Sequence, residues 1–213
     1  MPRDIPSTPS QADASRSRPR RRDAQQRREQ LLKAVGELLA EGRREFTLTY
    51  LAELAGVSVA TAYRNFPDTP AAITAYADEL TTGLIEALSA VPDSTGPVDE
   101  LRAVCHAWID LAAGWGPALV HLRSPEGVLA RRAAGDPFIV ALHRRLDAVL
   151  RRCVAAGALP PQDLDFAVLT WITLLDERVI IDLTQTLRWP VAEARQKLTG
   201  TLLAALRADR SDQ

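Results

Sequence analysis

Apolar residues along most of this chain recur at spacings of three and four, which places them on one face of an α-helix. The pattern is clearest over residues 22–42, where five apolar side chains share a face and charged residues occupy the rest. These five are Leu31, Leu32, Val35, Leu38 and Leu39. The same period predicts further helices over 69–90, 101–113, 118–122, 126–134, 137–157 and 190–207. Thr69 and Asp136 are expected to cap the helices over 69–90 and 137–157. The outer face of 137–157 is expected to carry His143, Arg144, Arg145, Arg151 and Arg152. We therefore predict an all-α fold with about nine to ten helices.

Residues 163–187 differ from the other segments because apolar side chains occupy every face of the expected helix. A helix that is buried on one side only does not need such a pattern. In the last helix, 190–207, Gly200, Ala204 and Ala205 allow a neighbouring helix to approach closely. We predict that these two segments form a homodimer interface, in which each helix buries a second face against the twofold mate. The alternative is a larger core within a monomer.

Two short helices joined by a tight turn are predicted within residues 46–66. The first begins near Thr49, whose hydroxyl would cap its start, and Gly56 ends it in the left-handed conformation. Ser58 then caps a second helix over 59–66. A helix, a glycine-containing turn and a helix within about twenty residues predict a helix-turn-helix unit, whose second helix enters the major groove of DNA. The helix over 22–42 completes its small core.

The net charge of −1 hides an asymmetry along the chain. Residues 1–66 contain 12 Arg and Lys against 8 Asp and Glu, whereas residues 67–213 contain 14 against 19. Residues 1–21 are rich in Pro, Ser and Arg, so we predict a disordered basic arm. Its arginines either contact phosphates or only make the tail soluble.

The helix-turn-helix segment also carries a recognisable motif. Its matching positions are Ala52, Ala55, Gly56, Val57, Ser58, Thr61, Tyr63, Phe66 and Pro67. The run TLTYLAELAGVSVATAYRNFPD resembles the signature of the TetR family of one-component bacterial transcription regulators. The resemblance covers residues 22–80. The rest of the chain is similar to the family only in being all-helical and in its length. The resemblance implies a homodimer with two N-terminal DNA-binding heads and C-terminal domains that hold an inducer and pair through four helices.

The resemblance implies specific DNA contacts. It places Val59 and Ala60 toward the bases, whose thymine methyls they can contact without bonding to purines. Thr61, Tyr63 and Asn65 stand at phosphate or thymine-methyl positions, although Tyr63 could instead be a core aromatic. Thr69 stands where the family usually has a lysine, so one phosphate contact is missing. The full predicted DNA-binding set is Thr49, Tyr50, Ser58, Val59, Ala60, Thr61, Tyr63, Arg64 and Asn65.

Aromatic and polar residues gather in the helices that follow. Aromatic walls with a few polar groups are typical of small-ligand sites, although plain core packing is the alternative for each aromatic. The predicted ligand-binding residues are His106, Trp108, Asp110, Trp115, His121, Phe138, Trp171 and Asp176. The ligand would bind better to a conformation in which the spacing of the two heads does not match one turn of DNA.

Several other functions lack support in the sequence. There is no phosphate-binding glycine loop or G-x-S-x-G motif, and no histidine has a second histidine or a cysteine three or four residues away. Cys105 and His106, with Asp110 nearby, do not form a metal site because adjacent residues point to different helix faces. We therefore expect no catalytic residues, no metal and no cofactor. Cys105 and Cys153 are expected to be buried thiols rather than a disulfide. Without an apolar run of membrane-spanning length or a secretory signal, we expect a cytoplasmic protein.

Three regions are therefore expected: the arm over 1–21, a DNA-binding domain over 22–68, and a ligand-binding and dimerisation domain over 69–213. The predicted function is that of a ligand-responsive transcription regulator, a repressor that a small-molecule inducer releases from a palindromic operator. The alternative is a helical ligand-binding or interaction module whose DNA-binding head is inactive. A small enzyme is a third class, without a polar catalytic cluster to support it.

Overall fold

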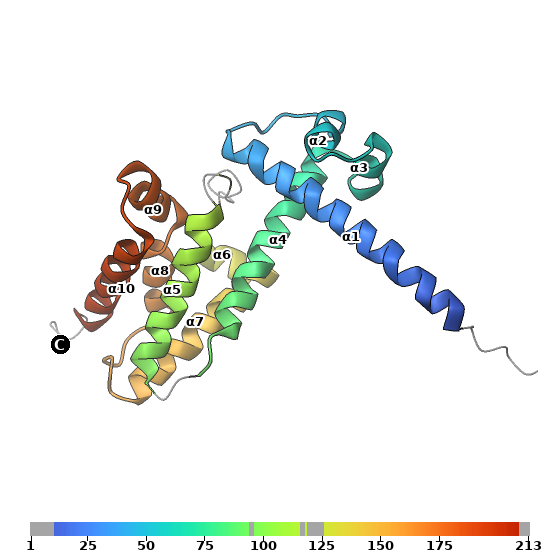
Figure 1. Ribbon diagram of the computed structural model, residues 1–213. Helices are drawn as coiled ribbons and strands as arrows, with labels where there is room; N and C mark the ends of the chain where they lie inside the picture. Colours follow the sequence, from blue (N-terminus) through green and yellow to red (C-terminus); the bar gives the residue numbers. More distant parts are fainter. Residues whose placement is uncertain (1–10, 94–95, 116–117, 119–125, 209–213) are drawn as a thin grey trace, which may run out of the picture. The chain divides into compact units, whose positions relative to one another are not determined.

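The computed structural model describes residues 11–93, 96–115, 118 and 126–208, with side chains described from residue 22 onward. Within these residues the regular secondary structure is entirely helical, which confirms the predicted all-α class (Figure 1). The chain divides into two compact units. The first contains α1 up to Leu38 together with Arg43–Tyr76, and the second contains Leu39–Gly42 and the chain from Ala77 onward.

The first unit is built from α1 (Gln11–Ala40), α2 (Leu48–Leu54), α3 (Val59–Asn65) and the start of α4 (Thr69–Ala90). α2 and α3 pack against each other (Figure 1). The five apolar residues predicted to share one face of the first helix are all buried, at 3% exposure or less. The amphipathic pattern therefore identified the buried face of α1 correctly. The other large buried side chains of this unit are Leu48, Leu51 and Phe66.

Two boundaries differ from the sequence-based expectations. α1 begins at Gln11, although we expected a disordered arm up to residue 21. The alanine and arginine residues of this stretch have high helix propensities, whereas Pro19, which lacks a backbone N–H, has a low one. The two units meet within α4, between Tyr76 and Ala77, rather than at residue 68. α4 therefore contributes residues to both units.

The second unit contains α5 (Pro97–Trp115), α6 (Val128–Ala133), α7 (Pro137–Ala155), α8 (Leu164–Leu174), α9 (Glu177–Ile181), the π-helical turn η2 (Asp182–Thr186) and α10 (Val191–Arg207). α5 lies at its centre and packs against α7, α9 and α10 (Figure 1). The predicted start of α7 is confirmed, because Asp136 accepts a hydrogen bond from the backbone N–H of Ile139. No helix of the described chain is long and apolar enough to span a membrane.

The segment 163–187 is not the single helix that we predicted. α8 ends at Leu174, and the chain restarts as α9 after Asp176, whose carboxylate accepts a hydrogen bond from the backbone N–H of Arg178 at 2.8 Å. An aspartate that bonds to the backbone locally can interrupt an apolar run that contains no glycine or proline. The predicted short helix over 118–122 lies outside the described residues, apart from Ala118.

The face of α7 predicted to be exposed is partly buried. His143 is only 6% exposed, and Arg145 and Arg152 both donate hydrogen bonds to Glu100 of α5. Glu100 is fully buried, at 0% exposure. Arg144 and Arg151 are exposed as predicted, whereas the prediction was wrong for His143 and Arg145 and in part for Arg152. The pattern along one helix does not reveal a carboxylate on a neighbouring helix.

Arg145 also holds the C-terminal end of α4. Its Nε donates to the backbone oxygen of Leu88 at 2.9 Å, and its Nη2 donates to that of Val91 at 3.1 Å. The last carbonyl groups of a helix have no partners within the helix, so a guanidinium that binds them closes the end of α4. Glu100 holds this guanidinium in place at 2.8 Å.

Candidate functional site

The helix-turn-helix of the first unit is defined by local caps. α2 begins after Thr47, whose hydroxyl accepts a hydrogen bond from the backbone N–H of Tyr50 at 3.1 Å. Thr49 lies inside the helix, so our assignment of Thr49 as the cap was wrong by two residues. Gly56 has a φ of 66°, the left-handed conformation predicted for the turn. Ser58 caps α3, also as predicted, by accepting from the backbone N–H of Thr61 at 3.2 Å.

Several polar side chains of α3 are bonded within the helix. The hydroxyl of Thr61, a residue only 7% exposed, lies 2.8 Å from that of Ser58. Arg64 donates to the Thr61 hydroxyl and to the backbone oxygen of Ala60, and the Asn65 amide donates to the backbone oxygen of Thr61. A DNA contact by these side chains would compete with bonds already made.

Two apolar side chains of α3 instead reach solvent. Val59 is 42% exposed and Tyr63 is 55% exposed, whereas Phe66 is 2% exposed. Phe66 therefore fills the core, and the alternative interpretation of Tyr63 as a core aromatic was wrong. Exposed apolar side chains at adjacent turns of one helix form a surface that can contact thymine methyls or the sugar-phosphate backbone.

Arg43 is a neighbouring residue that the sequence analysis missed. Its guanidinium lies over the ring of Tyr50, 5.0 Å from the centroid, and its Nη1 donates to the Tyr50 hydroxyl at 3.1 Å. Tyr50 is 37% exposed. A sequence separation of seven residues across a loop gives no periodic signal from which this pair could have been found.

The start of α4 is also organised differently from our expectation. Asp68 accepts a hydrogen bond from the backbone N–H of Ala71 at 2.8 Å, which is the capping role that we had assigned to Thr69. The Thr69 hydroxyl instead donates to the backbone oxygen of Phe46 at 2.7 Å. Thr69 thus ties the loop before α2 to the start of α4.

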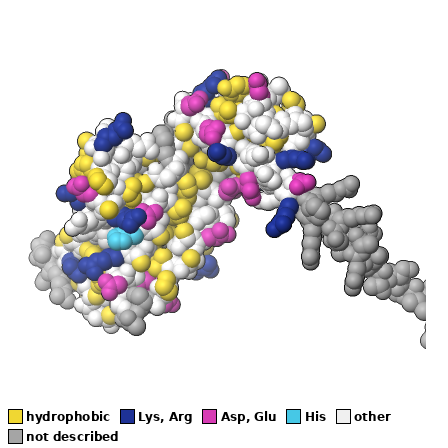
Figure 2. All heavy atoms as spheres, in the orientation of Figure 1, with side chains coloured by type: hydrophobic (Ala, Val, Ile, Leu, Met, Phe, Trp, Pro, Cys, Tyr) yellow, Lys and Arg dark blue, Asp and Glu magenta, His cyan; other side chains and the backbone are white. Residues whose placement is uncertain are grey.

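On the face in view in Figure 2, the described side chains form no large area of a single charge. Figure 2 shows Lys and Arg side chains interspersed with Asp and Glu over the face in view. A mixed surface attracts phosphates only weakly over long distances.

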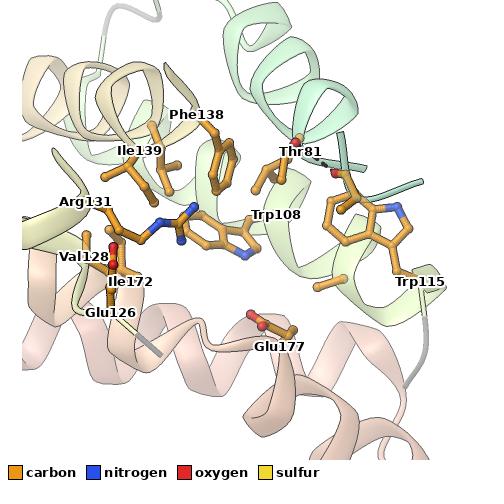
Figure 3. Close-up of a pocket in the computed structure, with 14 residues that line it drawn as sticks. Thr81, Trp108, Trp115, Glu126, Val128, Arg131, Phe138, Ile139, Ile172 and Glu177 are labelled. Carbon is orange, nitrogen blue, oxygen red and sulfur yellow. Dashed lines mark hydrogen bonds between the residues drawn. The ribbon is translucent and has the colours of Figure 1, made fainter. Parts of the chain in front are cut away.

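The second unit contains a cavity of about 180 Å³ between its helices (Figure 3). Trp108, Trp115 and Phe138, three of the predicted ligand-binding residues, line it together. Its other lining residues are Ala77, Thr81, Leu84, Ala112, Glu126, Val128, Arg131, Ile139, Leu142, Ile172 and Glu177. The cavity thus has mostly apolar walls with a few charged groups, as ligand sites commonly do.

The remaining predicted ligand-binding residues do not line this cavity. Trp171 is fully buried in the core, and Asp110 forms an ion pair with Arg195 of α10. Asp176 caps α9 and binds the side chain of its neighbour Arg178. His106 lies on α5 outside the cavity lining, and His121 falls outside the described residues.

Arg131 is the cationic side chain of the described lining, and it is held by Asp136. Its Nε and Nη2 donate to one carboxylate oxygen of Asp136 at 3.0 and 2.8 Å. Burial alone would raise the pKa of Asp136, but hydrogen bonds from Ile139 and Arg131 outweigh it and lower the pKa. Sequence reasoning missed Arg131, Glu126 and Glu177, because they flank short or irregular segments without clear periodicity.

No family model and no curated protein matches this chain, but solved structures share its fold. The fatty acid degradation regulator FadR from Bacillus halodurans aligns with a TM-score of 0.68 at 16% identity, over 83% of this chain and 94% of that one. FadR from Bacillus subtilis, in complex with stearoyl-CoA, aligns with a TM-score of 0.67 at 18% identity, over 82% and 97%. A TetR-family regulatory protein from Rhodococcus RHA1 gives 0.65 at 15% identity, over 84% and 96%. The chain therefore has the fold of TetR-family transcription regulators.

Proposed function

We propose that this protein is a ligand-responsive transcription regulator that binds a palindromic operator as a homodimer in the bacterial cytoplasm. The observation that carries the proposal is α3, a capped helix with Val59 and Tyr63 exposed, in a chain with the fold of TetR-family regulators. α3 would enter the major groove, with Val59 and Ala60 toward the bases and Tyr63 toward the backbone. Two such helices would lie one DNA turn apart, about 34–36 Å.

Exposed apolar residues support a dimer. In the segment after Asp163, Phe166 is 67% exposed, Val179 is 38% exposed and Leu187 is 57% exposed. Gly200 and Ala204 of α10 are also exposed, and small residues allow another helix to approach closely. Burying these residues against a second copy would remove apolar surface from water.

The cavity supports regulation by a small molecule. α4 contributes Ala77, Thr81 and Leu84 to its lining and begins at Thr69 in the first unit. A ligand that binds one conformation of this helix more tightly than another would change the population of DNA-binding conformations. We expect the ligand to release the protein from its operator. The ligand would then act as an inducer that relieves repression. Stearoyl-CoA is a ligand of the Bacillus subtilis neighbour, and at 18% identity the cavity of this chain has to be judged from its own side chains.

Selection of binding sites from random DNA, followed by fluorescence anisotropy over a range of salt concentrations, tests the proposal. We expect a palindromic site and an affinity that falls steadily as salt rises, because phosphate binding releases counterions. The rival is a ligand-binding or interaction module with an inactive head. It predicts that no sequence is enriched and that no binding occurs even at low salt.

A repressor and an activator are then separated by a reporter gene placed behind the selected site. Repression predicts that deleting the gene for this protein raises expression of the reporter. Lower expression of the reporter after deletion would indicate an activator. That result would not contradict binding of the protein to the operator.

A further inference from the structure

We propose that the cavity binds an uncharged ligand built on one aromatic ring, with an O–H or N–H group that donates a hydrogen bond to Thr81. A simple alkylphenol is a compound of this class. The inference rests on the proposed ligand-binding function and adds the chemical class of the ligand. It is carried by the volume of the cavity, its aromatic walls, the pairing of its charged groups and the hydrogen bonds of Thr81.

The volume of the cavity sets the size of the ligand. At about 180 Å³, the cavity is smaller than the roughly 300–1,000 Å³ of sites for drug-sized molecules. It is close in size to an engineered apolar cavity of about 150 Å³ that binds benzene. The cavity therefore has room for one ring and a few further carbon atoms.

The walls of the cavity favour an aromatic compound. Ten of the fourteen described lining residues are apolar, and they include Trp108 and Trp115 of α5 and Phe138 of α7 (Figure 3). Aromatic rings attract one another in offset-stacked or edge-to-face arrangements, with centroids about 4.5–7 Å apart. This attraction adds to the gain from burying apolar surface, so an aromatic ligand should bind more tightly than an aliphatic one of the same size.

The charged groups of the described lining already have partners. Arg131 donates two hydrogen bonds to Asp136, at 3.0 and 2.8 Å. Glu126 and Glu177 also interact with other residues of the protein. Moving a charged group from water into a mostly apolar site is costly unless a partner is provided there. A charged ligand would lose its hydration without gaining a free counter-charge from the described lining, so an uncharged ligand is favoured.

Thr81 supplies a hydrogen-bond acceptor within this lining. Its hydroxyl donates to the backbone oxygens of Ala77 and Asp78, at 2.9 and 3.1 Å. A hydroxyl group has one hydrogen, which is here used within α4, whereas the lone pairs of its oxygen can still accept a hydrogen bond. In the view of Figure 3, Thr81 lies between Phe138 and Trp115. A ligand that lies against Thr81 therefore has to be the donor.

Four compounds test the ligand class by isothermal titration calorimetry on the full-length protein at neutral pH. The reference is 4-ethylphenol, and 1-ethyl-4-fluorobenzene replaces its hydroxyl with fluorine. Tyramine and 4-hydroxyphenylacetate keep the phenol ring but carry an ammonium or a carboxylate on the side chain. We expect 4-ethylphenol to bind most tightly. The fluorinated compound should bind about fivefold more weakly because it lacks the donor, and each charged compound at least about tenfold more weakly.

Lengthening the alkyl group tests the size of the ligand. From phenol to 4-ethylphenol the affinity should rise about fourfold for each buried methylene. By 4-hexylphenol it should level off or fall, because the cavity is full. A steady rise up to 4-hexylphenol would refute the size limit.

Variants of Thr81 test the hydrogen bond. Thr81→Val keeps the shape of the side chain but removes the acceptor, so the ratio of the 4-ethylphenol affinity to the fluorobenzene affinity should fall to about one. Thr81→Ser keeps the hydroxyl and should keep the ratio. Thr170→Val is the matched control, because the Thr170 hydroxyl also donates to a backbone oxygen four residues earlier in its helix but does not line the cavity. It should leave the ratio unchanged.

The outcomes separate this inference from the proposed function. If a charged compound binds as tightly as 4-ethylphenol, or if Thr81→Val leaves the ratio unchanged, the proposed ligand class is refuted while the cavity remains a ligand site. If no compound of the series binds at millimolar concentration, the ligand class is also refuted. Selection of binding sites from random DNA decides independently whether the protein binds an operator.

Discussion

Glu100→Gln tests the buried ion cluster that joins α5, α7 and the end of α4. Glu100 is fully buried and accepts hydrogen bonds at 2.8 Å from the Nη1 of Arg145 and at 2.8 Å from the Nε of Arg152. Glutamine keeps the size of the side chain but replaces one acceptor oxygen with an NH₂ group. That group would face guanidinium donors, so at least one arginine would lose its hydrogen bond to the buried carboxylate. Asp93, which is 77% exposed, would remain 3.4 Å from Arg152 and 3.9 Å from Arg145.

The size of the effect follows from burial. Removing one partner of a buried ion pair costs about 3–5 kcal/mol of unfolding free energy when the remaining charge has no other partner. Here the exposed carboxylate of Asp93 still compensates the arginines in part. Arg145 is only 14% exposed, whereas Arg152 is 37% exposed and can be solvated in part. We therefore expect a loss near the lower limit, about 3 kcal/mol. For a chain of this size that loss lowers the melting temperature by roughly 6–12 °C.

Tryptophan fluorescence during urea unfolding is the appropriate assay. All four tryptophans lie in the second unit, so the signal reports on the unit that contains Glu100 and not on the first. The protein concentration has to be constant, because a dimer is more stable at higher concentration. Asp99→Asn is the control, since Asp99 precedes Glu100, is 73% exposed and pairs with Arg102 on the surface. It should cost about 0.5 kcal/mol.

The loss of stability caused by Glu100→Gln should also depend on pH. Burial alone raises the pKa of Glu100, but the hydrogen bonds and charges of Arg152 and Arg145 outweigh it and lower the pKa below its usual value. A carboxylate with a lowered folded-state pKa stabilises the protein above its unfolded pKa of about 4.3, and this stability is lost as pH falls through the folded value. The difference between Glu100→Gln and the native protein should therefore be full at neutral pH and shrink in acid. Equal losses for Glu100→Gln and Asp99→Asn at neutral pH would refute the reasoning.

Three further predictions concern the other surfaces. Tyr63→Ala should weaken binding to all operator sequences alike, whereas Val59→Ala should change the preference between sites by ~1 kcal/mol; identical effects in anisotropy titrations would contradict these roles. Phe166→Ala should destabilise the dimer by ~2 kcal/mol per copy in analytical sedimentation, and a native protein that is monomeric at micromolar concentration would defeat the dimer proposal. Burial raises the pKa of Cys105 to about 12 and of Cys153 to about 11, so iodoacetamide at neutral pH should label neither thiol before unfolding. Rapid labelling of the folded protein would show that these sites open.

Features that depend on neighbouring residues could be predicted from the sequence. Gly56 has the left-handed conformation, and Ser58 and Asp136 cap their helices as expected. A capping hydroxyl or carboxylate reaches a backbone N–H two or three residues away, so the information lies within one turn. The cap of α2 was assigned to the wrong threonine, because Thr47 and Thr49 both carry a hydroxyl suited to the role, and Thr47 is the one that accepts from the backbone. The same ambiguity led us to choose Thr69 over Asp68.

The cavity was predictable only in its aromatic part. Trp108, Trp115 and Phe138 are large apolar side chains on strongly periodic helices, so their shared location followed from amphipathic packing. Glu126 and Glu177 carry no such signal, since a charged residue beside a short helix has the same pattern whether it faces solvent or a cavity. Trp171 is also a large aromatic side chain on an apolar helix, so the sequence does not distinguish it from the aromatic residues that line the cavity, yet it is buried in the core.

The sequence by itself determined the helical class, the buried face of α1, and the turn and cap that orient α3, because each depends on residues within a few turns of one another. Tertiary structure alone decided which polar groups meet. Glu100 binds arginines that are 45 and 52 residues away, and the cavity draws its lining from α4 to α9. Pairing over such distances depends on how whole helices pack, and the periodicity of a single helix contains no information about the side chains of its neighbours.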